Sequence, residues 1–470
     1  MTDFNGLLPV SFLGIEGLLF QRMGELFRST MGELLELLDG LLFEVRNNER
    51  YKVKESKGGR IDTLFGTVEY RRRVYIDEET GERVYGLDEA LGLRKRARIS
   101  PGLKNAAVLQ AVDGPSYRGA RDSLKLFYGH QVLSHETIRQ CVLDIGKRIE
   151  KEMRRERENP RGTRKVDVLF IEADGLWVSR QRSGKREARL VISHEGWRPR
   201  AGAAGEYELV DRTHYYADGS EKGLWEEASR QLYSTYDLGD TMVVINGDRA
   251  KWIREGVGYF PNAMYQFDRF HLKRELKSVL REVPEACKAA LDALDGNRSE
   301  ALLALLREVR LREPGAREGL AKLRHDLERN SEALVDYRER LRGLGYETTG
   351  MRGMGSAESN VNRFSRRLKK QGRSWGKRGL SAMIHTMAKR FEGSLGAFAS
   401  RLDEAIEEIT EVLDDGRLVA GAGRLARDMF DEVACATTAH IPALDVGRSA
   451  SGGLSWSLRR LSNALPAGLS

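Results

Sequence analysis

Three acidic residues stand in settings that suit the ligands of divalent cations. Asp174 comes just after a short apolar run at 166–171, and Asp248 follows a second such run. Short apolar runs bounded by polar sequence are typical of buried strands, so both aspartates are expected at strand ends. Glu358 opens a strongly helical stretch for which Ser356 is the predicted N-cap. We therefore predict that two strand-end aspartates and one helix-borne glutamate meet in a common site.

Phosphoryl transfer is the chemistry that this set of carboxylates would support. Mg²⁺ and Mn²⁺ are hard cations that prefer oxygen ligands. Two such ions can clamp both the attacking and the leaving oxygen of a phosphodiester. A single aspartate after a strand is more often a turn former than a catalytic group. The prediction therefore depends on the three residues together.

Two further residues are expected beside this site. A helix is predicted to begin near Asp268, and His271 follows three residues later on the same helical face. Asp268 and His271 would then have an accessory role at the metal site. Each also has a purely structural explanation, because aspartate often caps a helix and histidine is often buried and hydrogen-bonded.

The sequence resembles the insertion-sequence transposases of the DDE type, and within them the ISLre family of transposases and transposase-like proteins. The resemblance covers most of the chain and is carried by four blocks in order: Ile171-Glu-Ala-Asp-Gly175, Asn246-Gly-Asp-Arg-Ala-Lys-Trp-Ile253, Tyr265-Gln-Phe-Asp-Arg-Phe-His-Leu-Lys273, and Gly355-Ser-Ala-Glu-Ser359 followed by Ser374-Trp375. One departure is Arg249, where a second glycine is expected in the family. A bulky cation there would crowd the metal site or touch phosphate.

The resemblance implies a DNA transposase of an insertion sequence. Asp174, Asp248 and Glu358 would be its catalytic residues and would hold Mg²⁺ or Mn²⁺, and the protein would cleave and join DNA strands at the element ends. Its partners would be the terminal inverted repeats, the target DNA and further copies of the chain. The alternatives are a domesticated transposase-like protein that binds DNA without cutting it, and a nuclease of the same fold. The choice between a cut-and-paste and a copy-type pathway stays open.

The predicted fold class is an α/β ribonuclease-H-like catalytic core with an all-helical insertion, preceded by a β-hairpin and a helical, helix-turn-helix-type DNA-binding region. The chain would be a multidomain α+β protein overall. Within the core, the patterns from 166 to 245 predict the order β-β-β-α-β. Seven segments are expected: an N-terminal helical segment at 1–55, a β-hairpin region at 56–98, a helix-turn-helix-like domain at 99–160, the first part of the core at 161–283, a helical insertion at 284–350, the second part of the core with the glutamate helix at 351–400, and a C-terminal helical region at 401–470.

Helical spacing of apolar residues predicts one amphipathic helix or a helical pair over 11–45. The β-type pattern begins near residue 61, with a hairpin turn at 77–81. Ser100, Ser116 and Ser134 each precede a predicted helix, and the three helices have the layout of a helix-turn-helix unit. An ordinary three-helix packing module would look the same.

Basic side chains in three segments are predicted to contact DNA. The basic residues of the last of the three helices would read the DNA sequence. The hairpin arginines would bind phosphates, or would only protect an edge strand from aggregation. The basic residues after Glu358 would bind phosphates, or would only form a solvated helix face. In chain order the three sets are: His135, Arg139 and Lys147; Arg71, Arg72 and Arg73; and Arg366, Arg367, Lys369, Lys370 and Arg373.

Composition limits the class of protein. The net charge of +8 and the pI near 9.2 fit a polyanionic partner. Three widely spaced cysteines argue against a disulfide framework and a structural zinc site. No run approaches the roughly 18 apolar residues of a membrane span, and no signal-peptide pattern opens the sequence. We expect a cytoplasmic, nucleoid-associated protein.

Overall fold

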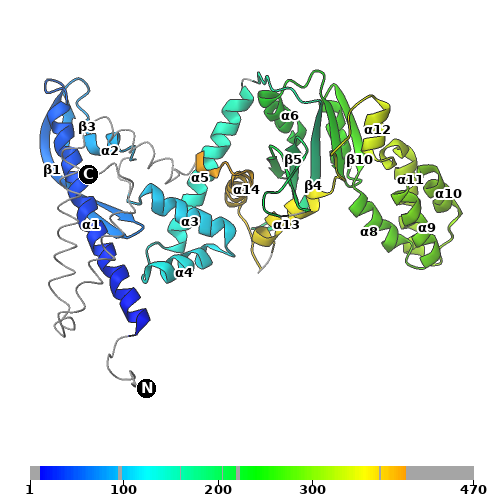
Figure 1. Cartoon of the computed structure of the whole chain (residues 1–470), viewed down its shortest axis with the longest axis horizontal. Helices are drawn as coiled ribbons and strands as arrows, with labels where there is room; N and C mark the ends of the chain where they lie inside the picture. Colours follow the sequence, from blue (N-terminus) through cyan, green and yellow to red (C-terminus); the bar gives the residue numbers. More distant parts are fainter. Residues whose placement is uncertain are drawn as a thin grey trace, which may run out of the picture. The chain divides into compact units, whose positions relative to one another are not determined.

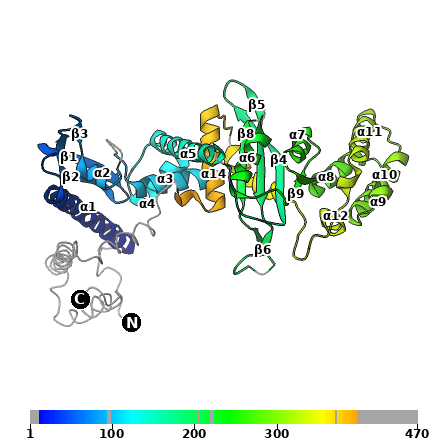
Figure 2. The same cartoon turned by 90° about the horizontal axis from the view of Figure 1, so that it is seen from above.

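The computed structural model describes residues 11–93, 98–158, 160–203, 205–218, 223–369 and 372–397 (Figures 1 and 2). These residues form a mixed α/β protein that divides into two compact units. Among the described residues, 11–60 and 68–93 belong to the first unit, and 61–67 together with those between 98 and 397 belong to the second. The C-terminal helical region predicted at 401–470 lies outside the described residues.

The first unit holds one long helix and most of a small sheet. The predicted helix or helical pair is a single helix, α1 (Phe12–Val45). The sheet has the order β1 (Tyr51–Thr63), β2 (Gly66–Asp77), β3 (Arg83–Val84), and the short helix α2 (Gly86–Ala90) follows. The predicted turn at 77–81 joins β2 to β3. Strand β1 begins ten residues before the expected β-type pattern, because its exposed first half carries lysines and glycines without an apolar alternation.

The three helices predicted after residue 100 are confirmed. They are α3 (Pro101–Asp113), α4 (Tyr117–Tyr128) and α5 (His135–Glu158). The hydroxyl of each predicted capping serine accepts a backbone N–H of the first turn. The donors are Leu103 N to Ser100, Gly119 N to Ser116 and Thr137 N to Ser134. Such caps satisfy backbone donors that have no partner inside a helix.

A five-stranded sheet forms the centre of the second unit. Its spatial order is β10 (Asn262–Phe267), β9 (Met242–Gly247), β4 (Val168–Arg180), β5 (Gly184–His194), β8 (Thr213–Asp218). The pairs β10–β9 and β9–β4 are parallel, whereas β4–β5 and β5–β8 are antiparallel. A separate ribbon of β6 (Trp197–Pro199) and β7 (Tyr207–Leu209) interrupts the path from β5 to β8. Helix α6 (Leu224–Thr235) precedes β9, so the predicted β-β-β-α-β order is present with that ribbon added.

Asp174 does not end its strand, and this expectation was wrong. Strand β4 continues to Arg180 because β5 pairs with it antiparallel along its whole second half. The neighbouring strand β9 stops pairing with β4 at Ala173. Asp174 therefore lies where the parallel part of the sheet ends, although its own strand continues.

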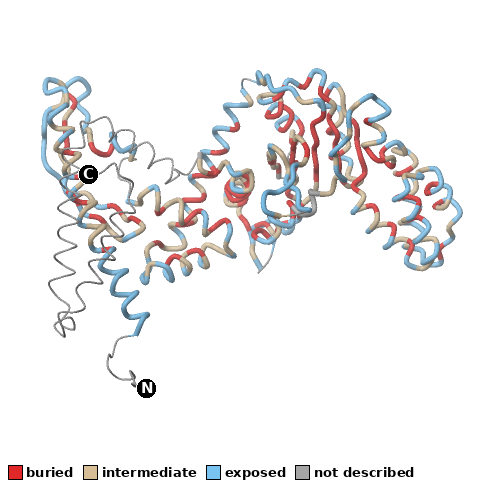
Figure 3. Tube along the Cα trace, in the orientation of Figure 1, coloured by how far each residue is buried: buried red, intermediate tan, exposed pale blue. Residues whose placement is uncertain are grey.

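The strands of the sheet are mostly buried (Figure 3), and apolar side chains pack on both of its faces. Trp225 and Leu232 of α6 belong to the same buried cluster as Leu169 and Ile171 of β4. On the other face, Tyr337 and its helix α12 (Tyr337–Gly343) join a second cluster with Phe170 and Val244.

The predicted insertion at 284–350 is helical. After β9 come α7 (Lys251–Arg254) and the 3-10 helix η1 (Glu255–Tyr259), and after β10 come α8 (Arg269–Val279), α9 (Pro284–Asp295), α10 (Ser299–Glu308), α11 (Pro314–Arg329) and the 3-10 helix η2 (Ser331–Leu334). The last described elements are α13 (Ser356–Leu368), α14 (Lys377–Glu392) and the 3-10 helix η3 (Leu395–Ala397). No described helix is both long and apolar enough to cross a membrane.

Helix α14 packs against both α5 and β8 (Figures 1 and 2). At the crossing with α5, a Cβ on Gly146 would lie only 2.4 Å from Ala382 Cα and 2.9 Å from its carbonyl oxygen. Only glycine permits so close an approach of two helix backbones. The predicted helix-turn-helix-like segment is therefore packed into the second unit through its longest helix.

A buried hydrogen-bonded pair, His214 and Glu392, joins β8 to the end of α14. His214 Nδ1 lies 3.1 Å from Glu392 Oε1, and His214 N donates to the same oxygen at 2.7 Å. Burial lowers the pKa of His214 below its usual range. Burial alone would raise the pKa of Glu392, but the hydrogen bond from His214 and the charge of Lys389 lower it overall.

We expect this pair to make the protein acid-sensitive. Both folded-state pKa values lie below the unfolded values of about 6.5 and about 4.3, so the unfolded chain takes up protons first as the pH falls. Stability is therefore full above about pH 6.5 and is lost as the pH drops through these values. Thermal unfolding from pH 7.5 to 4.0 should show a shallower acid decline in His214→Gln than in the wild type, because glutamine keeps a donor toward Glu392 and does not titrate. The exposed-site control Glu300→Gln should follow the wild type, and parallel curves for all three proteins would contradict the assignment.

Candidate functional site

Three aspartates occupy equivalent positions at one edge of the central sheet. The strand register pairs Ala173 of β4 with Gly247 of β9, and Gly247 with Phe267 of β10. Asp174, Asp248 and Asp268 are the next residues after this row. Neighbouring strands lie about 4.8 Å apart, so the backbones of Asp174 and Asp248 are adjacent and that of Asp268 is one strand further on.

The turn after β9 holds Asp248 in a defined position. Its Oδ1 accepts the backbone N–H of Ala250 at 2.9 Å. The hydroxyl of Tyr265 donates to the Asp248 carbonyl oxygen at 2.6 Å and to that of Gly247 at 3.1 Å. Burial raises the pKa of Tyr265, which keeps this hydroxyl protonated as a donor. Asp174 is half-buried, and its Oδ1 accepts the backbone N–H of Gly175 at 2.7 Å.

Asp268 is the N-cap of α8, as one of the two explanations of this residue predicted. Its Oδ1 accepts the backbone N–H of His271 at 2.9 Å, and its Oδ2 accepts Asn246 Nδ2 at 3.0 Å. His271 Nδ1 lies 3.8 Å from the same carboxylate. Sequence reasoning did not predict Asn246 as a site residue. Its position directly before Gly247-Asp248 could have indicated that it lies beside the aspartates. Asn246 links the ends of β9 and β10.

A second buried polar group lies one step behind the aspartates. Glu172 and His194 have fully buried side chains, with His194 Nε2 3.5 Å from Glu172 Oε1. Nδ1 of His194 lies 3.2 Å from the backbone nitrogen of Gly196 and 3.3 Å from its carbonyl oxygen. His194 also stacks on Phe170, with ring centroids 5.3 Å apart. Sequence reasoning missed this pair because its members are neighbours only across β4 and β5.

The helix that carries Glu358 lies beside the strand that carries Asp174, because α13 packs against β4. The helix begins one residue earlier than expected: Gly355 is its N-cap, and Ser356 is its first residue. The side chain of Glu358 lies outside the described residues. Among the side chains that are described, no three of His, Cys, Asp and Glu are grouped to hold a metal ion. The three-carboxylate ligand set therefore stays a prediction.

Arg249 makes its contacts with the helical insertion. Its Nε donates to Glu275 Oε2 of α8 at 2.9 Å, and its Nη1 donates to Asp326 Oδ2 of α11 at 2.5 Å. The guanidinium thus joins two helices of the region after β10. These two carboxylates pair with the charge of Arg249, which stands beside Asp248 where the family is expected to carry a glycine.

The basic residues predicted to read DNA on α5 have different surroundings. His135 is half-buried, whereas Lys147 is exposed. Arg139 forms a bidentate pair with Glu136 on the same helix, at 2.9 and 2.6 Å. The hydrogen bonds from Arg139 and Gln140 hold the pKa of Glu136 at about 2, so the pair is ionised at neutral pH.

Two of the three hairpin arginines are engaged within the first unit. Arg72 Nη2 lies 3.1 Å from Asp88 Oδ2, and Arg73 Nη1 lies 2.7 Å from Asp39 Oδ2. Arg71 alone has an exposed side chain. Strand β3 pairs with β2, which carries these arginines, only at Tyr75 and Ile76, and the backbone N–H groups of Arg71 and Arg73 donate instead to the carboxylates of Glu36 and Asp39 in α1.

The basic run after Glu358 is likewise divided. Arg366 and Lys369 are exposed, and Lys370 lies outside the described residues. Arg373 is half-buried and donates to the carbonyl oxygen of Arg367. Arg367 is only 4% exposed, and its Nε donates to the Ala111 carbonyl oxygen of α3 at 2.8 Å. The helical pattern gave no sign that this arginine is interior.

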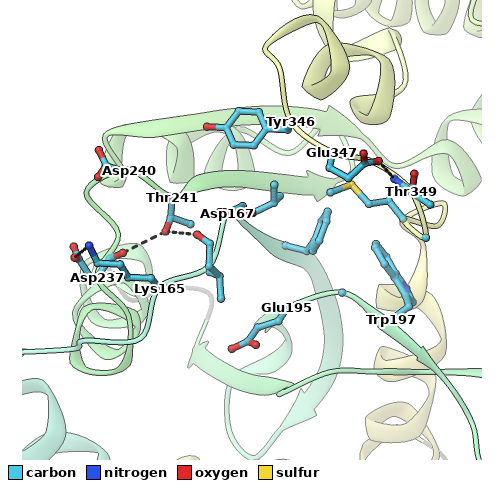
Figure 4. Close-up of a pocket in the computed structure, with 16 residues that line it drawn as sticks. Lys165, Asp167, Glu195, Trp197, Asp237, Asp240, Thr241, Tyr346, Glu347 and Thr349 are labelled. Atoms are coloured by element: carbon cyan, nitrogen blue, oxygen red, sulfur yellow. Dashed lines mark hydrogen bonds and ion pairs between the residues drawn. The ribbon is translucent and has the colours of Figure 1, made fainter.

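A cavity of about 650 Å³ lies at the opposite edge of the sheet, where β4 and β9 begin (Figure 4). Asp167, Glu195, Asp237, Asp240 and Glu347 are among its lining residues. Part of this charge is already paired, since Lys165 Nζ lies 3.6 Å from Asp237 Oδ2 and Arg164 Nη2 lies 2.7 Å from Glu195 Oε2. This cavity is therefore distinct from the edge with the aligned aspartates.

The chain belongs to the uncharacterised protein family UPF0236, which it matches over residues 9–404. A relative from Streptococcus gallolyticus, described as a UPF0236 protein in the vanSb 3′ region, is 29% identical over 410 residues, covering 84% of this chain and 86% of that protein. A UPF0236 protein of Caldanaerobacter subterraneus subsp. tengcongensis is 25% identical over 345 residues, covering 72% of this chain and 68% of that protein, and its name joins eleven locus designations.

Among solved structures, the chain matches the Drosophila P element transposase strand transfer complex. The identity is 10%, and the match covers 66% of this chain and 82% of that chain. The TM-score is 0.22, which is too low to establish a shared fold.

Proposed function

We propose that this protein is a DDE-type DNA transposase of an insertion sequence, similar to the ISLre family, with a ribonuclease-H-like core. The observation that carries the proposal is the register of the central sheet, which aligns Asp174 and Asp248 on neighbouring parallel strands. Helix α13, with Glu358 in its first turn, packs against the first of these strands. The β-β-β-α-β order of β4, β5, β8, α6 and β9 is the order expected of such a core.

The donor chemistry of this edge fits Mg²⁺ or Mn²⁺. Asp174 and Asp248 offer carboxylate oxygens from adjacent backbones, and hard divalent cations prefer oxygen ligands. Asp174, Asp248 and Glu358 would hold the ions, with Asp268 in an accessory position. When bound, the metal supplies the positive charge that activates the attacking oxygen and stabilises the leaving oxygen of a phosphodiester.

The contribution of the protein itself is to hold the carboxylates in place. The amide of Ala250 and the hydroxyl of Tyr265 fix the turn that presents Asp248. Asn246 fixes the carboxylate of Asp268 from the neighbouring strand. Groups held on strands and by second hydrogen bonds keep their geometry better than groups on mobile loops.

Two further observations support a mobile-element protein. Arg249 has two carboxylate partners on α8 and α11, so its charge and bulk are accounted for away from Asp248. One relative carries eleven locus designations of a single organism under one name, as expected for a sequence that is copied within a genome.

The test is metal-dependent cleavage of DNA from the ends of the coding segment's own element. The purified full chain is incubated with labelled duplexes of that flanking DNA in Mg²⁺, in Mn²⁺ or in EDTA. We expect a nick at the element end with either metal and joining of the freed 3′ end to a plasmid, with no product in EDTA. Binding without cleavage under every condition would instead favour the domesticated, non-cutting alternative.

A further inference from the structure

A basic cleft of about 720 Å³ lies between the helices α4 and α5 on one side and residues 373–379 on the other. Six of the sixteen residues that line it are arginine or lysine, and none is aspartate or glutamate. The acidic cavity of Figure 4 has five carboxylate residues among its lining and a single lysine. The six cations come from segments far apart in sequence: Arg118, Arg139, Arg367, Arg373, Lys377 and Arg378.

Three helices begin at this cleft. Ser116 and Tyr117 at the start of α4, His135 at the start of α5, and Gly376 and Lys377 at the start of α14 all line it. The N-terminus of a helix carries about half a positive charge and has N–H groups without partners inside the helix, which favours anions. At α4 and α5 the hydroxyls of Ser116 and Ser134 already accept one such N–H each. At α14 the N-cap Gly376 has no side chain to occupy these donors.

Arg367 adds a buried charge behind the cleft. Its guanidinium carbon lies 5.1 Å from the ring centroids of both Tyr117 and Trp375. No carboxylate in the described part of the chain pairs with it, and its Nη2 is buried without a hydrogen-bond partner there. Burial, with the nearby charge of Arg373, lowers the pKa of Arg367 to about 10. A buried cation without a counterion is unfavourable, so an anion in the cleft would offset a cost already present in the fold.

The wall opposite α5 is held in place. Trp375 N donates to Ser179 O, and Gln181 N donates to Trp375 O, each at 3.0 Å, which joins this segment to the end of β4. The indole Nε1 of Trp375 donates to the Leu368 carbonyl oxygen at 3.0 Å. A preformed site loses little entropy on binding and needs no rearrangement to present its charges.

We infer that this cleft seats backbone phosphates of a DNA strand. The inference rests on the proposed function for the identity of the polyanion. It also changes the role expected of α5: His135 and Arg139 share a cleft with the cations of residues 373–379, and therefore contact the backbone rather than base edges. Phosphate contacts supply affinity and orientation without sequence information.

The test removes two exposed charges from opposite walls, in the variant Arg118→Gln/Arg378→Gln. The control Arg312→Gln/Arg317→Gln removes two exposed arginines of the helical insertion and so matches the charge change. Binding of the full chain is measured by fluorescence anisotropy on a duplex with the element end and on a random duplex, at several salt concentrations without divalent metal. In the cleft variant we expect an affinity loss of about tenfold or more on both duplexes. The salt slope should fall by about one per residue.

Two results would overturn the inference. One is an equal effect of the cleft and control variants, and the other is a loss confined to the element-end duplex, which would return α5 to base reading. Metal-dependent cleavage is assayed separately. If the wild type does not cleave DNA but the cleft variant clearly loses affinity, the transposase is rejected and the cleft is kept. Normal cleavage with unchanged affinity in that variant would reject the cleft and keep the transposase.

Discussion

Asp248→Asn is expected to slow metal-dependent DNA cleavage by about a thousandfold while leaving DNA affinity nearly unchanged. A metal ion contributes several kcal/mol to the stabilisation of developing charge, and each 1.36 kcal/mol is tenfold in rate. Asparagine keeps the size of the side chain and the oxygen that accepts the amide of Ala250 at 2.9 Å. The turn should therefore survive, and the lost property is the ligand charge.

The same reasoning applies to Asp174→Asn, whose oxygen accepts Gly175 N at 2.7 Å. The matched control is Asp240→Asn, an exposed residue that lines the cavity at the opposite edge of the sheet. Cleavage rates, duplex binding and thermal unfolding are compared for the four proteins. If Asp248→Asn or Asp174→Asn cleaves DNA at the wild-type rate, the aspartate replaced in that variant is not a metal ligand. If Asp240→Asn also loses cleavage, the loss of activity in these variants reflects a change in folding and not the loss of a metal ligand.

Gly146→Val is expected to destabilise the second unit by about 3 kcal/mol or more. A Cβ on Gly146 would meet Ala382 Cα at 2.4 Å and its carbonyl oxygen at 2.9 Å, so backbone atoms obstruct it. Overpacking costs about 1–3 kcal/mol where side chains can adjust, and more where two helices must separate. The better helix propensity of other residues over glycine offsets at most about 1 kcal/mol of this.

Thermal unfolding checks the prediction, with a decrease in Tm of about 5 °C or more expected for a unit of this size. The control is Gly315→Ala in α11, where the added Cβ meets nothing within 4 Å. That variant should be neutral or more stable by about 0.5–1 kcal/mol. An unchanged Tm in Gly146→Val would show that α5 and α14 approach less closely than described here.

Much of the local structure was predictable from short stretches of sequence. Ser100, Ser116 and Ser134 each precede a helix and cap it through their own hydroxyl groups. The turn at 77–81 and the helices of 284–350 were equally visible. These features depend on residues within a few positions of each other, so a single pattern contains the physical cause.

Predictions that depended on distant partners succeeded less often. The apolar run before Asp174 indicated a strand end, but pairing with β5 extends β4 to Arg180. The linear pattern also did not show that Arg72 and Arg73 pair with Asp88 and Asp39, or that Arg367 is buried and donates to the Ala111 carbonyl oxygen. A basic residue has the same sequence signature whether its partner is a phosphate, a carboxylate or a carbonyl oxygen.

The sequence alone determined which residues begin helices and which runs form the central strands. Tertiary structure decided that Asp174, Asp248 and Asp268 share one register row, that Arg249 makes its contacts on α8 and α11, and that three helix N-termini open on one basic cleft. The physical reason is the separation in sequence over which each kind of interaction acts. Periodicity and capping act over a few residues, whereas strand register, burial and ion pairing are set by contacts between segments that the linear pattern does not connect.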